Sequence, residues 1–504
     1  MKEFIGINIG ALLTKFSAIE PLKEKEIYNE KDFKLKLVLN DIIDRVLPSI
    51  IQYKENNTIF IGQSTKLGYK KYYLSTFDNL SRLLGLVCDN GINDLEKKYF
   101  LTLDNFEIGY FNFIIDNIKY QQPADYFVFT FIEQLDKKIK NKLNDYELKK
   151  YIFAIPDYYT YYQKESLQNM LKLKYNSMTF PLINESTALT MYYGYFNYKE
   201  LNDDDKKYII FIDIGHSKTS FILSEFTKKE FIVKNVVNIP FLGGRDFNNR
   251  IFEFCLKKFK EEYNRDLTVT GRIKVRLMEE IEIKRKILSI NDEVNINIDG
   301  IEKGIDFSFI MKKSEFEEII SNEIELFKRE FKLFYEKIKS NYKISKIEMA
   351  GQLMRTPKLK SIVYEISEIT LSETIAMDMC HSFGVLLYGT LILEKRNYEE
   401  LKSVKSYNNY SLYYSFDKKD KKELIKKGDI FPFENRILIN DEYKQNCENI
   451  FIYYDNDELN NLNIVLDKEL QLINIKNCIK KKGQNLYLKY KINEENEITI
   501  IDEK

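Results

Sequence analysis

The stretch that decides the fold runs from Tyr208 to Arg250. It opens with YIIFIDIGHSKTSFIL at residues 208–223 and closes with FLGGRDFNNR at residues 241–250. The first part predicts an apolar strand that ends in an acid and a glycine, then a tight turn and a second strand. Such a hairpin places Asp213 at the mouth of a sheet, where it could hold a hydrated Mg²⁺ ion, since Mg²⁺ prefers waters plus one or two carboxylates.

The turn after this strand is a candidate anion site. Backbone N–H groups of Gly215, His216 and Ser217 would form a concavity of the kind that binds anions. Gly243 and Gly244 carry no Cβ atom, so their backbone can approach a ligand closely. We therefore expect an anionic ligand beside a metal ion, with a helix opening just after the two glycines.

The N-terminal segment repeats this pattern. Residues 5–18 read IGINIGALLTKFSA, and both copies run through a strand, an amide or acid (Asn8 or Asp213), Ile, Gly, a turn and a second strand. Two copies about 200 residues apart suggest a two-fold internal repeat. We expect two similar lobes that each present a turn to a shared cleft. The alternative is two unrelated buried hairpins.

Composition narrows the class of protein. The 504 residues suit two to four domains, and 44% apolar residues allow large cores. Lys+Arg and Asp+Glu both number 77, so the charge gives no sign of a nucleic-acid partner. No apolar run approaches the ~20 residues that cross a bilayer. The cysteines form no CxxC pair, which favours reduced thiols and a cytoplasmic protein; they are Cys88, Cys255, Cys380, Cys447 and Cys478.

Periodicity predicts alternating helices and strands up to about residue 394. Helices are expected at 123–144, 162–173, 248–263, 273–288, 314–339 and 378–394, and strands at 151–156, 294–299, 305–310 and 347–351. Residues 182–190 should turn from strand into helix. Residues 395–409 are polar and suit an interdomain linker. Short strands between polar turns then predict an all-β module, with strands at 411–416, 436–439, 450–454, 463–466, 486–492 and 497–501.

The order of these segments resembles the seventy-kDa heat-shock proteins, which are built on the actin-like ATPase fold. The signatures are Asn8–Gly10, Ile183–Ala188, Asp213–Gly215, Leu242–Phe247, Glu282–Ser289, Gly351–Pro357 and Asp378–Gly384. The resemblance implies an α/β, two-lobed fold of ribonuclease H-like repeats, followed by an all-β sandwich. The domains would be 1–394, with lobes at about 1–200 and 207–394, the linker 395–409 and the sandwich 410–504.

Within that family the chain looks closest to the one-hundred-and-ten-kDa branch, the nucleotide-exchange co-chaperones. The branch has Asp-Ile-Gly-His-Ser where the main branch has Asp-Leu-Gly-Gly-Gly, and this chain has the former at Asp213–Ser217. It also shares Gly243–Phe247 and the aromatic opening of the β module at Tyr410–Ser415. The resemblance implies a seventy-kDa heat-shock chaperone as partner, and unfolded polypeptide as a further one.

The chain departs from the family at the phosphate end of the cleft. A metal-holding Asp, two hydroxyls, a catalytic lysine, a second-loop Thr and a glycine are replaced by Asn8, Ala11 with Leu12, Ser81, Lys218 and Gln352. Phosphoryl transfer depends on positioning and charge stabilisation. Single electrostatic groups contribute ~3 kcal/mol to a transition state, so several kcal/mol should be lost. We expect ATP or ADP to bind with little hydrolysis.

The adenosine side is better kept. The resemblance implies that Lys286 and Arg355 sandwich the base, that Glu282 and Arg285 bind the ribose, and that Ser289 reaches the base. The remaining nucleotide-binding positions would be Gly10, Gly215, His216, Ser217, Gly243, Gly244, Gly351 and Asp378. Asp213, Asn8, Glu185 and Asp378 would hold Mg²⁺ through water, with Asp213 and Glu185 as the candidate catalytic groups.

Three functions follow from the resemblance. The first is an ATP-binding co-chaperone that acts as a nucleotide-exchange factor. The alternatives are an ATP-dependent foldase of the main branch and a nucleotide-free holdase or scaffold. The printed sequence ends with the β module, without the helical domain that embraces the partner in the exchange-factor branch, and this predicts weakened exchange. A sugar kinase of the same fold would leave the β module without a role.

Overall fold

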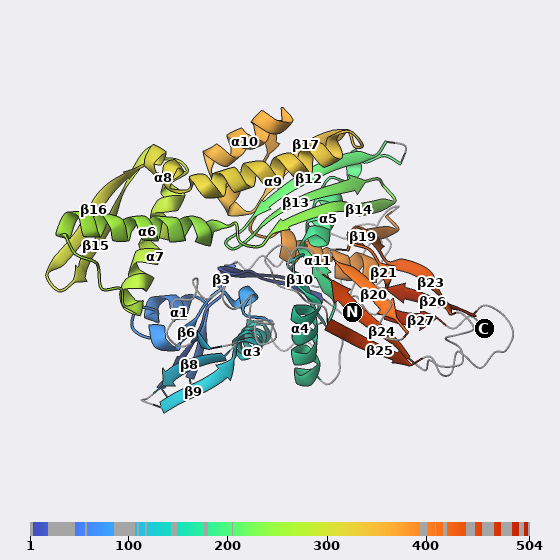
Figure 1. Ribbon diagram of the computed structural model, residues 1–504, viewed down its shortest axis with the longest axis horizontal. Helices are drawn as coiled ribbons and strands as arrows, with labels where there is room; N and C mark the ends of the chain where they lie inside the picture. The colour runs from blue at the N-terminus through green and yellow to red at the C-terminus, as the bar shows by residue number, and fades with distance from the viewer. Residues whose placement is uncertain are drawn as a thin grey trace, which may run out of the picture.

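The protein is described from a computed structural model (Figure 1). The structure describes residues 4–18, 46–55, 58–84, 106–107, 110–115, 118–142, 150–175, 180–203, 205–393, 401–408, 410–416, 421–439, 449–455, 468–474, 486–492 and 498–501. Of the cysteines, Cys255 and Cys380 lie in these ranges, and both are buried free thiols. The other three lie outside the described residues.

The first sheet forms around the N-terminal strand. Its order is β11-β10-β1-β2-β3, with β10 and β11 parallel to β1 and the hairpin partner β2 antiparallel. All six residues of β1 are buried, which explains why its sequence is apolar rather than strictly alternating. The strands are Phe4–Ile9 (β1), Leu13–Ala18 (β2), Val46–Pro48 (β3), Lys150–Ile155 (β10) and Leu182–Asn184 (β11).

The second sheet repeats the topology of the first. Its order begins β18-β17-β12-β13-β14, again with two parallel strands on one side of the central strand and an antiparallel meander on the other. The predicted internal repeat is thus confirmed in the strand order. The strands are Lys207–Ile214 (β12), Thr219–Phe226 (β13), Glu230–Ile239 (β14), Ile344–Ala350 (β17) and Leu371–Ser372 (β18).

The two central hairpins close with the same turn. The Gly10 N–H donates to the carbonyl of Leu13 at 3.1 Å, and the Gly215 N–H donates to the carbonyl of Lys218 at 2.9 Å. The repeat therefore extends from strand order to individual backbone hydrogen bonds.

Helices cover the sheets, and their buried stripes explain where they form. In α9, Ile324, Phe327, Phe331, Phe334 and Ile338 recur every three or four residues and are buried. Three of these rings contact Phe221 of β13. The helices are Gln63–Gly68 (α1), Ala124–Lys142 (α3), Tyr161–Lys174 (α4), Glu185–Phe196 (α5), Gly244–Tyr263 (α6), Gly271–Leu288 (α7), Lys313–Ile319 (α8), Ser321–Lys339 (α9), Pro357–Ser367 (α10) and Cys380–Leu387 (α11).

Some expected helices differ in detail. The single helix expected at 314–339 is two helices, α8 and α9, separated at the buried residue Ile320. The helix expected at 378–394 is α11 followed by a π-helical segment, Tyr388–Leu393. The helix expected from residue 123 starts at Ala124, because Pro123 still belongs to a strand.

Smaller sheets flank the two main ones. Beside the first sheet lie Ile51–Lys54 (β4), Thr58–Ile61 (β5), Thr76–Phe77 (β6), Phe106–Glu107 (β7), Tyr110–Ile115 (β8) and Ile118–Pro123 (β9). The hairpin of Glu293–Glu302 (β15) and Ile305–Lys312 (β16) packs on α7 beyond the second sheet. In Figure 1 this hairpin lies at one end of the molecule and the C-terminal strands lie at the other.

Helices α5 and α11 cross in backbone contact. A Cβ atom at Gly384 of α11 would lie 1.9 Å from the carbonyl oxygen of Ala188 in α5. A Cβ atom at Gly6 of β1 would lie 2.1 Å from the carbonyl oxygen of Ser382 in α11. Only glycine fits at these two positions, and it lets α11 pack directly on both elements.

The expected linker is partly a strand. Residues Ser403–Tyr407 (β19) pair in parallel with β14, and Ile430–Phe431 (β22) pairs with β19 in turn. Val404 and Tyr407 are buried in the same core as Phe231 of β14. The second half of the predicted linker is therefore built into the second sheet, because its few apolar side chains have a core to enter.

The residues after β19 form only strands in the parts that the structure describes. They make a four-stranded sheet, β21-β20-β24-β25, and a three-stranded sheet, β23-β26-β27. Whether these sheets pack as a sandwich stays a prediction, and the strand expected at 463–466 lies outside the described residues. The strands are Ser411–Ser415 (β20), Lys422–Ile425 (β21), Phe433–Ile439 (β23), Asn449–Asp455 (β24), Lys468–Asn474 (β25), Leu486–Ile492 (β26) and Ile498–Ile501 (β27).

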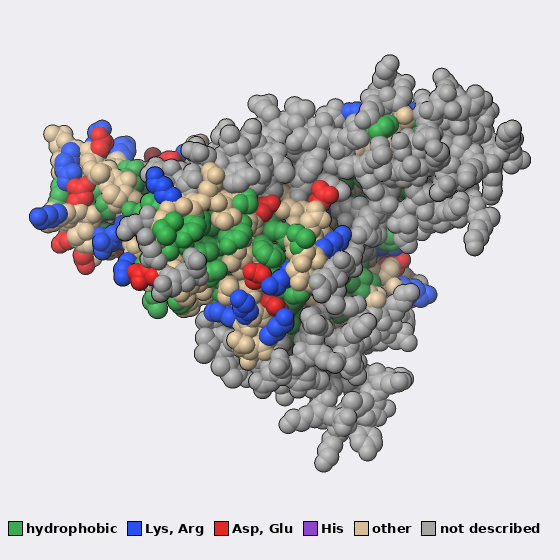
Figure 2. Space-filling model, turned by 90° about the horizontal axis from the view of Figure 1, so that it is seen from below, with side chains coloured by type: hydrophobic (Ala, Val, Ile, Leu, Met, Phe, Trp, Pro, Cys, Tyr) green, Lys and Arg blue, Asp and Glu red, His purple; other side chains and the backbone are tan. Residues whose placement is uncertain are grey.

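One face of the molecule carries hydrophobic, basic and acidic side chains. In Figure 2, described hydrophobic side chains gather near the middle of this face, with basic and acidic side chains interspersed around them. Within the described ranges, no helix has both the length and the apolar character needed to cross a membrane.

The docking of β19 gives a first testable prediction. Substituting Val404→Ser should speed amide hydrogen exchange at residues 403–407 by ~10-fold or more. Burying a valine side chain stabilises a fold by ~1.5–3 kcal/mol, and each 1.4 kcal/mol is a factor of ten. The matched control is Lys402→Ser, which changes an exposed neighbour. Equal exchange rates in the two variants would contradict the docked strand.

Candidate functional site

A cavity of about 650 Å³ lies between the two repeats. Its lining includes both hairpin turns, the start of α5, one side of α7 and the loop after β17. Most of the predicted site residues line it: Asn8, Gly10, Glu185, Asp213, Gly215, His216, Ser217, Gly244, Glu282, Arg285, Lys286, Ser289, Gly351 and Arg355. The other positions of departure, Ala11, Leu12, Ser81, Lys218 and Gln352, line it as well. Gly243 and Asp378 are not among the lining residues.

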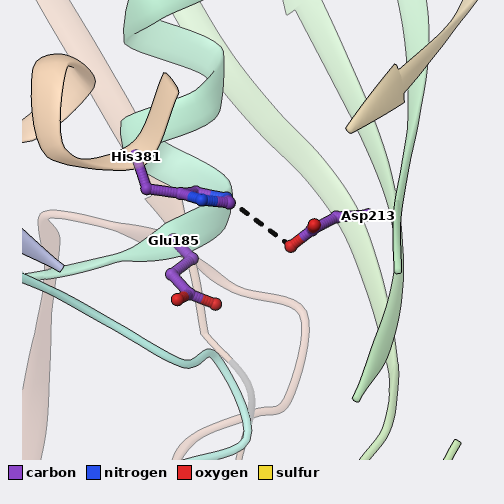
Figure 3. Close-up of side chains that lie close together, drawn as sticks. All are labelled: Glu185, Asp213 and His381. Atoms are coloured by element: carbon purple, nitrogen blue, oxygen red, sulfur yellow. Dashed lines mark ion pairs between the residues drawn. The ribbon is translucent and has the colours of Figure 1, made fainter. Parts of the chain in front are cut away.

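Three buried side chains converge at the floor of the cavity (Figure 3). Glu185 begins α5 directly after the first sheet, Asp213 lies near the end of β12 in the second sheet, and His381 lies in the first turn of α11. The His381 Nε2 atom is 3.5 Å from Asp213 Oδ2. Elements from both repeats thus bring two acids and an imidazole together.

A fourth side chain, Lys218, joins the two acids. It stands directly before β13, and its Nζ atom lies 2.7 Å from Asp213 Oδ2 and 2.7 Å from Glu185 Oε2. The same ammonium donates to Ser220 Oγ at 3.2 Å. The buried ammonium therefore makes two hydrogen bonds, to Asp213 and Ser220, and an ion pair with Glu185.

The ion pairs keep these buried groups charged. Burial opposes ionisation of Asp213, but Lys218 and His381 outweigh it and hold the pKa of Asp213 at about 2. Burial likewise opposes ionisation of Glu185, yet Lys218 leaves the pKa of Glu185 below its ordinary value. The pKa of Lys218 is raised, because its carboxylates overcome the effect of burial. For His381, burial is outweighed by Cys380 and Asp213, which raise its pKa to about 9.

Asn8 completes this cluster from the first sheet. Its Nδ2 atom donates to Glu185 Oε1 at 2.7 Å and to the carbonyl of Ala154 at 3.4 Å. Asn8 was predicted to contact a metal through water. The structure instead pairs it with the second carboxylate oxygen of Glu185.

The arrangement does not fit a Mg²⁺ ion. The ligand atoms of Glu185, Asp213 and His381 lie within 4.8 Å of one another, close enough for a metal site. However, Glu185 spends both oxygens on Lys218 and Asn8, and Asp213 Oδ2 faces Lys218 and His381. A divalent ion bound there would have to displace the Lys218 ammonium, which already lies between the two carboxylates.

The turn predicted to bind an anion is partly used by the fold. The Gly215 N–H is engaged in its own turn, and the Gly244 N–H donates to the Gly215 carbonyl at 3.1 Å. The Gly243 N–H donates to Asp246 Oδ2 at 2.8 Å, and a Cβ atom at Gly243 would lie 2.6 Å from the His216 carbonyl. The glycine pair therefore docks α6 onto the turn, and His216 and Ser217 remain as the candidates for an anion contact.

Glu282, Arg285, Lys286 and Asn248 form a polar network, here called the polar wall, on the predicted adenosine side of the cavity. Glu282 accepts hydrogen bonds from Asn248 at 2.6 Å, Arg285 at 2.8 Å and Lys286 at 2.8 Å. Burial opposes its ionisation, but Arg285 and its other basic neighbours keep the pKa of Glu282 well below the ordinary value. The Ser289 hydroxyl donates to the Lys286 carbonyl at 2.6 Å. The acid and two bases expected from the sequence thus form one network.

His216 lines the cavity beside the polar wall, and its imidazole is neutral at pH 7. Burial lowers its pKa to about 4, and the nearby Arg245, Arg285 and Lys286 act in the same direction. Its ring can therefore accept or donate a hydrogen bond but brings no positive charge to a ligand.

The loop after β17 borders the cavity through a glycine that the geometry requires. Gly351 has φ +78°, and a Cβ atom there would lie 2.3 Å from the Ile214 carbonyl and 2.7 Å from Asp213 Oδ1. Gln352 donates a hydrogen bond to the Asp378 carboxylate. Asp378 was predicted to order the water around a metal ion. Gln352 lines the cavity and Asp378 does not, so Asp378 reaches the cavity only through Gln352, and its role toward a metal stays a prediction.

Sequence reasoning missed three residues of this site. Lys218 was expected only to remove a hydroxyl, whereas it bridges the two acids. His381 was inside a quoted motif but had no assigned role, and Asn248 was taken as part of an amphipathic helix. One signal was available for the histidines, because the chain has only two and both line this cavity.

The two repeats also touch at residues that do not line the cavity. Lys70, just after α1, forms an ion pair with Glu279 of α7 at 3.0 Å. Beside it, Ile50, Tyr69 and Val275 form a small apolar cluster. The contact between the repeats therefore extends beyond the cavity.

Comparison with known proteins points to one family. The family model described as "Hsp70 protein" matches residues 27–495. A heat shock protein homolog of Lachancea kluyveri is 25% identical over 403 residues, which are 77% of this chain and 56% of that protein. Heat shock 70 kDa protein 16 of Arabidopsis thaliana is 24% identical over 442 residues, 84% of this chain and 56% of that protein.

A third relative matches a smaller share of both proteins. Heat shock protein 88 of Dictyostelium discoideum is 23% identical over 348 residues, 67% of this chain and 44% of that protein. The chain thus spans about half the length of the curated relatives that it matches.

The buried lysine gives a second prediction. Lys218→Met should lower the free energy of unfolding at pH 7 by ~3–5 kcal/mol, because two buried carboxylates lose the ammonium that lies between them. The loss should shrink at pH 5, where the unpaired carboxylates take up protons. The unaltered protein should instead lose stability as the pH falls. Its Asp213 has a pKa of about 2, below the ordinary 3.8, so that stabilisation is present above about pH 4 and lost as the pH falls toward 2.

Urea unfolding at the two pH values measures this effect. The control is Lys286→Met, whose side chain is 49% exposed and also pairs with a glutamate; a change below ~1 kcal/mol is expected for so exposed a pair. A Lys218→Met loss that stays constant between pH 5 and pH 7 would contradict the buried cluster.

Proposed function

The chain belongs to the Hsp70 family, and from that premise we propose that it is a co-chaperone which binds ATP or ADP with little hydrolysis. Its role would be to speed nucleotide exchange on a seventy-kDa heat-shock chaperone. The family implies the actin-like, two-lobed ATPase fold, which accords with the repeated sheets around the cavity.

The observation that carries weak hydrolysis is the buried pairing of Lys218 with Asp213 and Glu185. A carboxylate held by an ammonium and an amide is a poor base and is not free to orient an attacking water. The nearby turn offers Ala11 and Leu12 in place of hydroxyls, and elsewhere in the cavity lining Ser81 stands in place of a lysine. Because phosphoryl transfer relies on such positioned groups, turnover should be slow.

Nucleotide binding is supported by the other half of the cavity. Ligand pockets usually measure about 300–1,000 Å³, and this one measures about 650 Å³. The network of Glu282, Arg285 and Lys286 offers charged groups of both signs, with Arg355 also in the lining. These residues would hold the base and ribose, and the phosphates would lie toward His216 and Ser217.

The exchange role rests on similarity. The relatives that the chain matches include heat shock protein homologs of Lachancea kluyveri and Saccharomyces cerevisiae, and the sequence shares the Asp213–Ser217 signature of the exchange-factor branch. Because the chain spans about half of those relatives, its partner is part of the proposal. We take that partner to be a seventy-kDa heat-shock chaperone in the cytoplasm, with unfolded polypeptide as a further ligand.

A second candidate is a holdase or scaffold that binds no nucleotide. The same buried cluster favours it, because acids already paired with Lys218 need no bound cation to hold them. Calorimetry with ATP separates the two candidates, since only the co-chaperone releases or absorbs heat on binding.

The adenosine side yields a third prediction. Lys286→Ala should weaken ATP binding roughly 2- to 30-fold, the range for losing a cation–π contact of about 0.5–2 kcal/mol. Isothermal calorimetry measures it. Lys284→Ala is the control, because this lysine is on the same helix, pairs with Glu280 and does not line the cavity. Equal affinities for the two variants would remove Lys286 from the site.

The exchange role has its own test. Labelled ADP preloaded on a seventy-kDa heat-shock chaperone should leave faster when this protein and unlabelled ATP are added than with ATP and an inert protein. Stopped-flow fluorescence measures the release rate. Unchanged release would end the co-chaperone proposal. Sustained ATP turnover stimulated by peptide would instead identify a main-branch foldase.

A further inference from the structure

We propose that the Lys218 ammonium replaces the divalent cation of this cleft, so that the protein binds its nucleotide without a metal ion. The nucleotide part of this inference rests on the proposed function. The cation part rests on the cluster of Lys218, Glu185, Asp213 and Asn8 alone.

The first argument is position. A cation held between Glu185 and Asp213 would join the acid that starts α5 to the acid near the end of β12. Lys218 Nζ already stands there, at 2.7 Å from an oxygen of each. Mg²⁺ binds oxygen at about 2.0–2.1 Å and requires near-octahedral geometry. An ion on either of those oxygens would press against the ammonium, with like charges in a water-poor place.

The second argument is the supply of oxygens. Glu185 Oε2 contacts Lys218, and its Oε1 accepts the Asn8 amide. Asp213 Oδ2 contacts both Lys218 and the ring of His381. Asp213 Oδ1 faces the backbone of Gly351 so closely that a Cβ atom there would lie 2.7 Å away. Few oxygens are left for the waters and carboxylates of a hydrated metal.

The third argument is charge. The two carboxylates already share the positive charge of the Lys218 ammonium without an added ion. The purpose of a divalent ion beside nucleotide phosphates is to offset negative charge. Here the Lys218 ammonium offsets part of the negative charge of Glu185 and Asp213. Lys15 also lines the cavity and adds a further positive charge to it.

The cation part is tested with Mn²⁺ and no nucleotide. Electron paramagnetic resonance of free Mn²⁺ should show no stoichiometric loss of signal on adding the unaltered protein. Lys218→Thr should bind one Mn²⁺ per chain, because the two carboxylates lose their counter-ion. The control is Lys206→Thr, which removes a lysine from another buried acid, Glu225, outside the cavity lining; it should leave the signal unchanged.

Stoichiometric Mn²⁺ binding by the unaltered protein that Asp213→Asn abolishes would overturn the cation part. That comparison decides the question even where Lys218→Thr does not fold, and circular dichroism establishes folding for each variant. A folded Lys218→Thr that binds no Mn²⁺ would also count against the inference.

The nucleotide part is tested by calorimetry with ATP, in EDTA and again with excess Mg²⁺. The two dissociation constants should differ by less than about tenfold. Binding that vanishes in EDTA would overturn metal-free binding and leave the proposed co-chaperone function intact. Absence of binding in both buffers would overturn the nucleotide part together with the ATP-binding function, and the Mn²⁺ titration would still decide the cation part.

Discussion

The buried contact of Lys218 with Glu185 and Asp213 is the constraint on which the site depends. Glu185 follows the last strand of the first sheet, whereas Asp213 and Lys218 belong to the central hairpin of the second. The ammonium therefore joins the two repeats as well as two charges. Removing one partner of a buried ion pair destabilises a protein strongly. The ion pairs of Lys218 therefore hold the two repeats together at the base of the cavity.

This constraint separates binding from turnover. The polar wall around Glu282 is a hydrogen-bonded network that a ligand could use. The floor has its charges already paired, and the turn above it carries Ala11 and Leu12 where hydroxyls would contact phosphate. The same fold thus keeps a nucleotide-sized space while its reactive end is occupied by a salt bridge.

Local patterns predicted the fold well, and long-range contacts were less accessible. The matching hairpins at Asn8 and Asp213 were visible because a strand–turn–strand signal lies within about 15 residues. The ion pair between Lys218 and Glu185 was not visible in the sequence, because the two residues come together only when the two sheets assemble. The polar composition of 395–409 likewise concealed β19, whose pairing depends on β14. The sequence also did not reveal that the N–H groups of Gly243 and Gly244 dock α6 onto the turn, because those contacts form only when the two segments pack.

The glycine at the crossing of α5 and α11 limits how the two halves can move. Gly384 lets the two backbones touch, so a shift of one helix along the other would drive the neighbouring side chains of α11 into α5. Any side chain larger than hydrogen at Gly384 would push α5 and α11 apart. Because α11 packs on the first sheet and α5 also packs on β14 of the second, this one position sets the spacing between the two sheets.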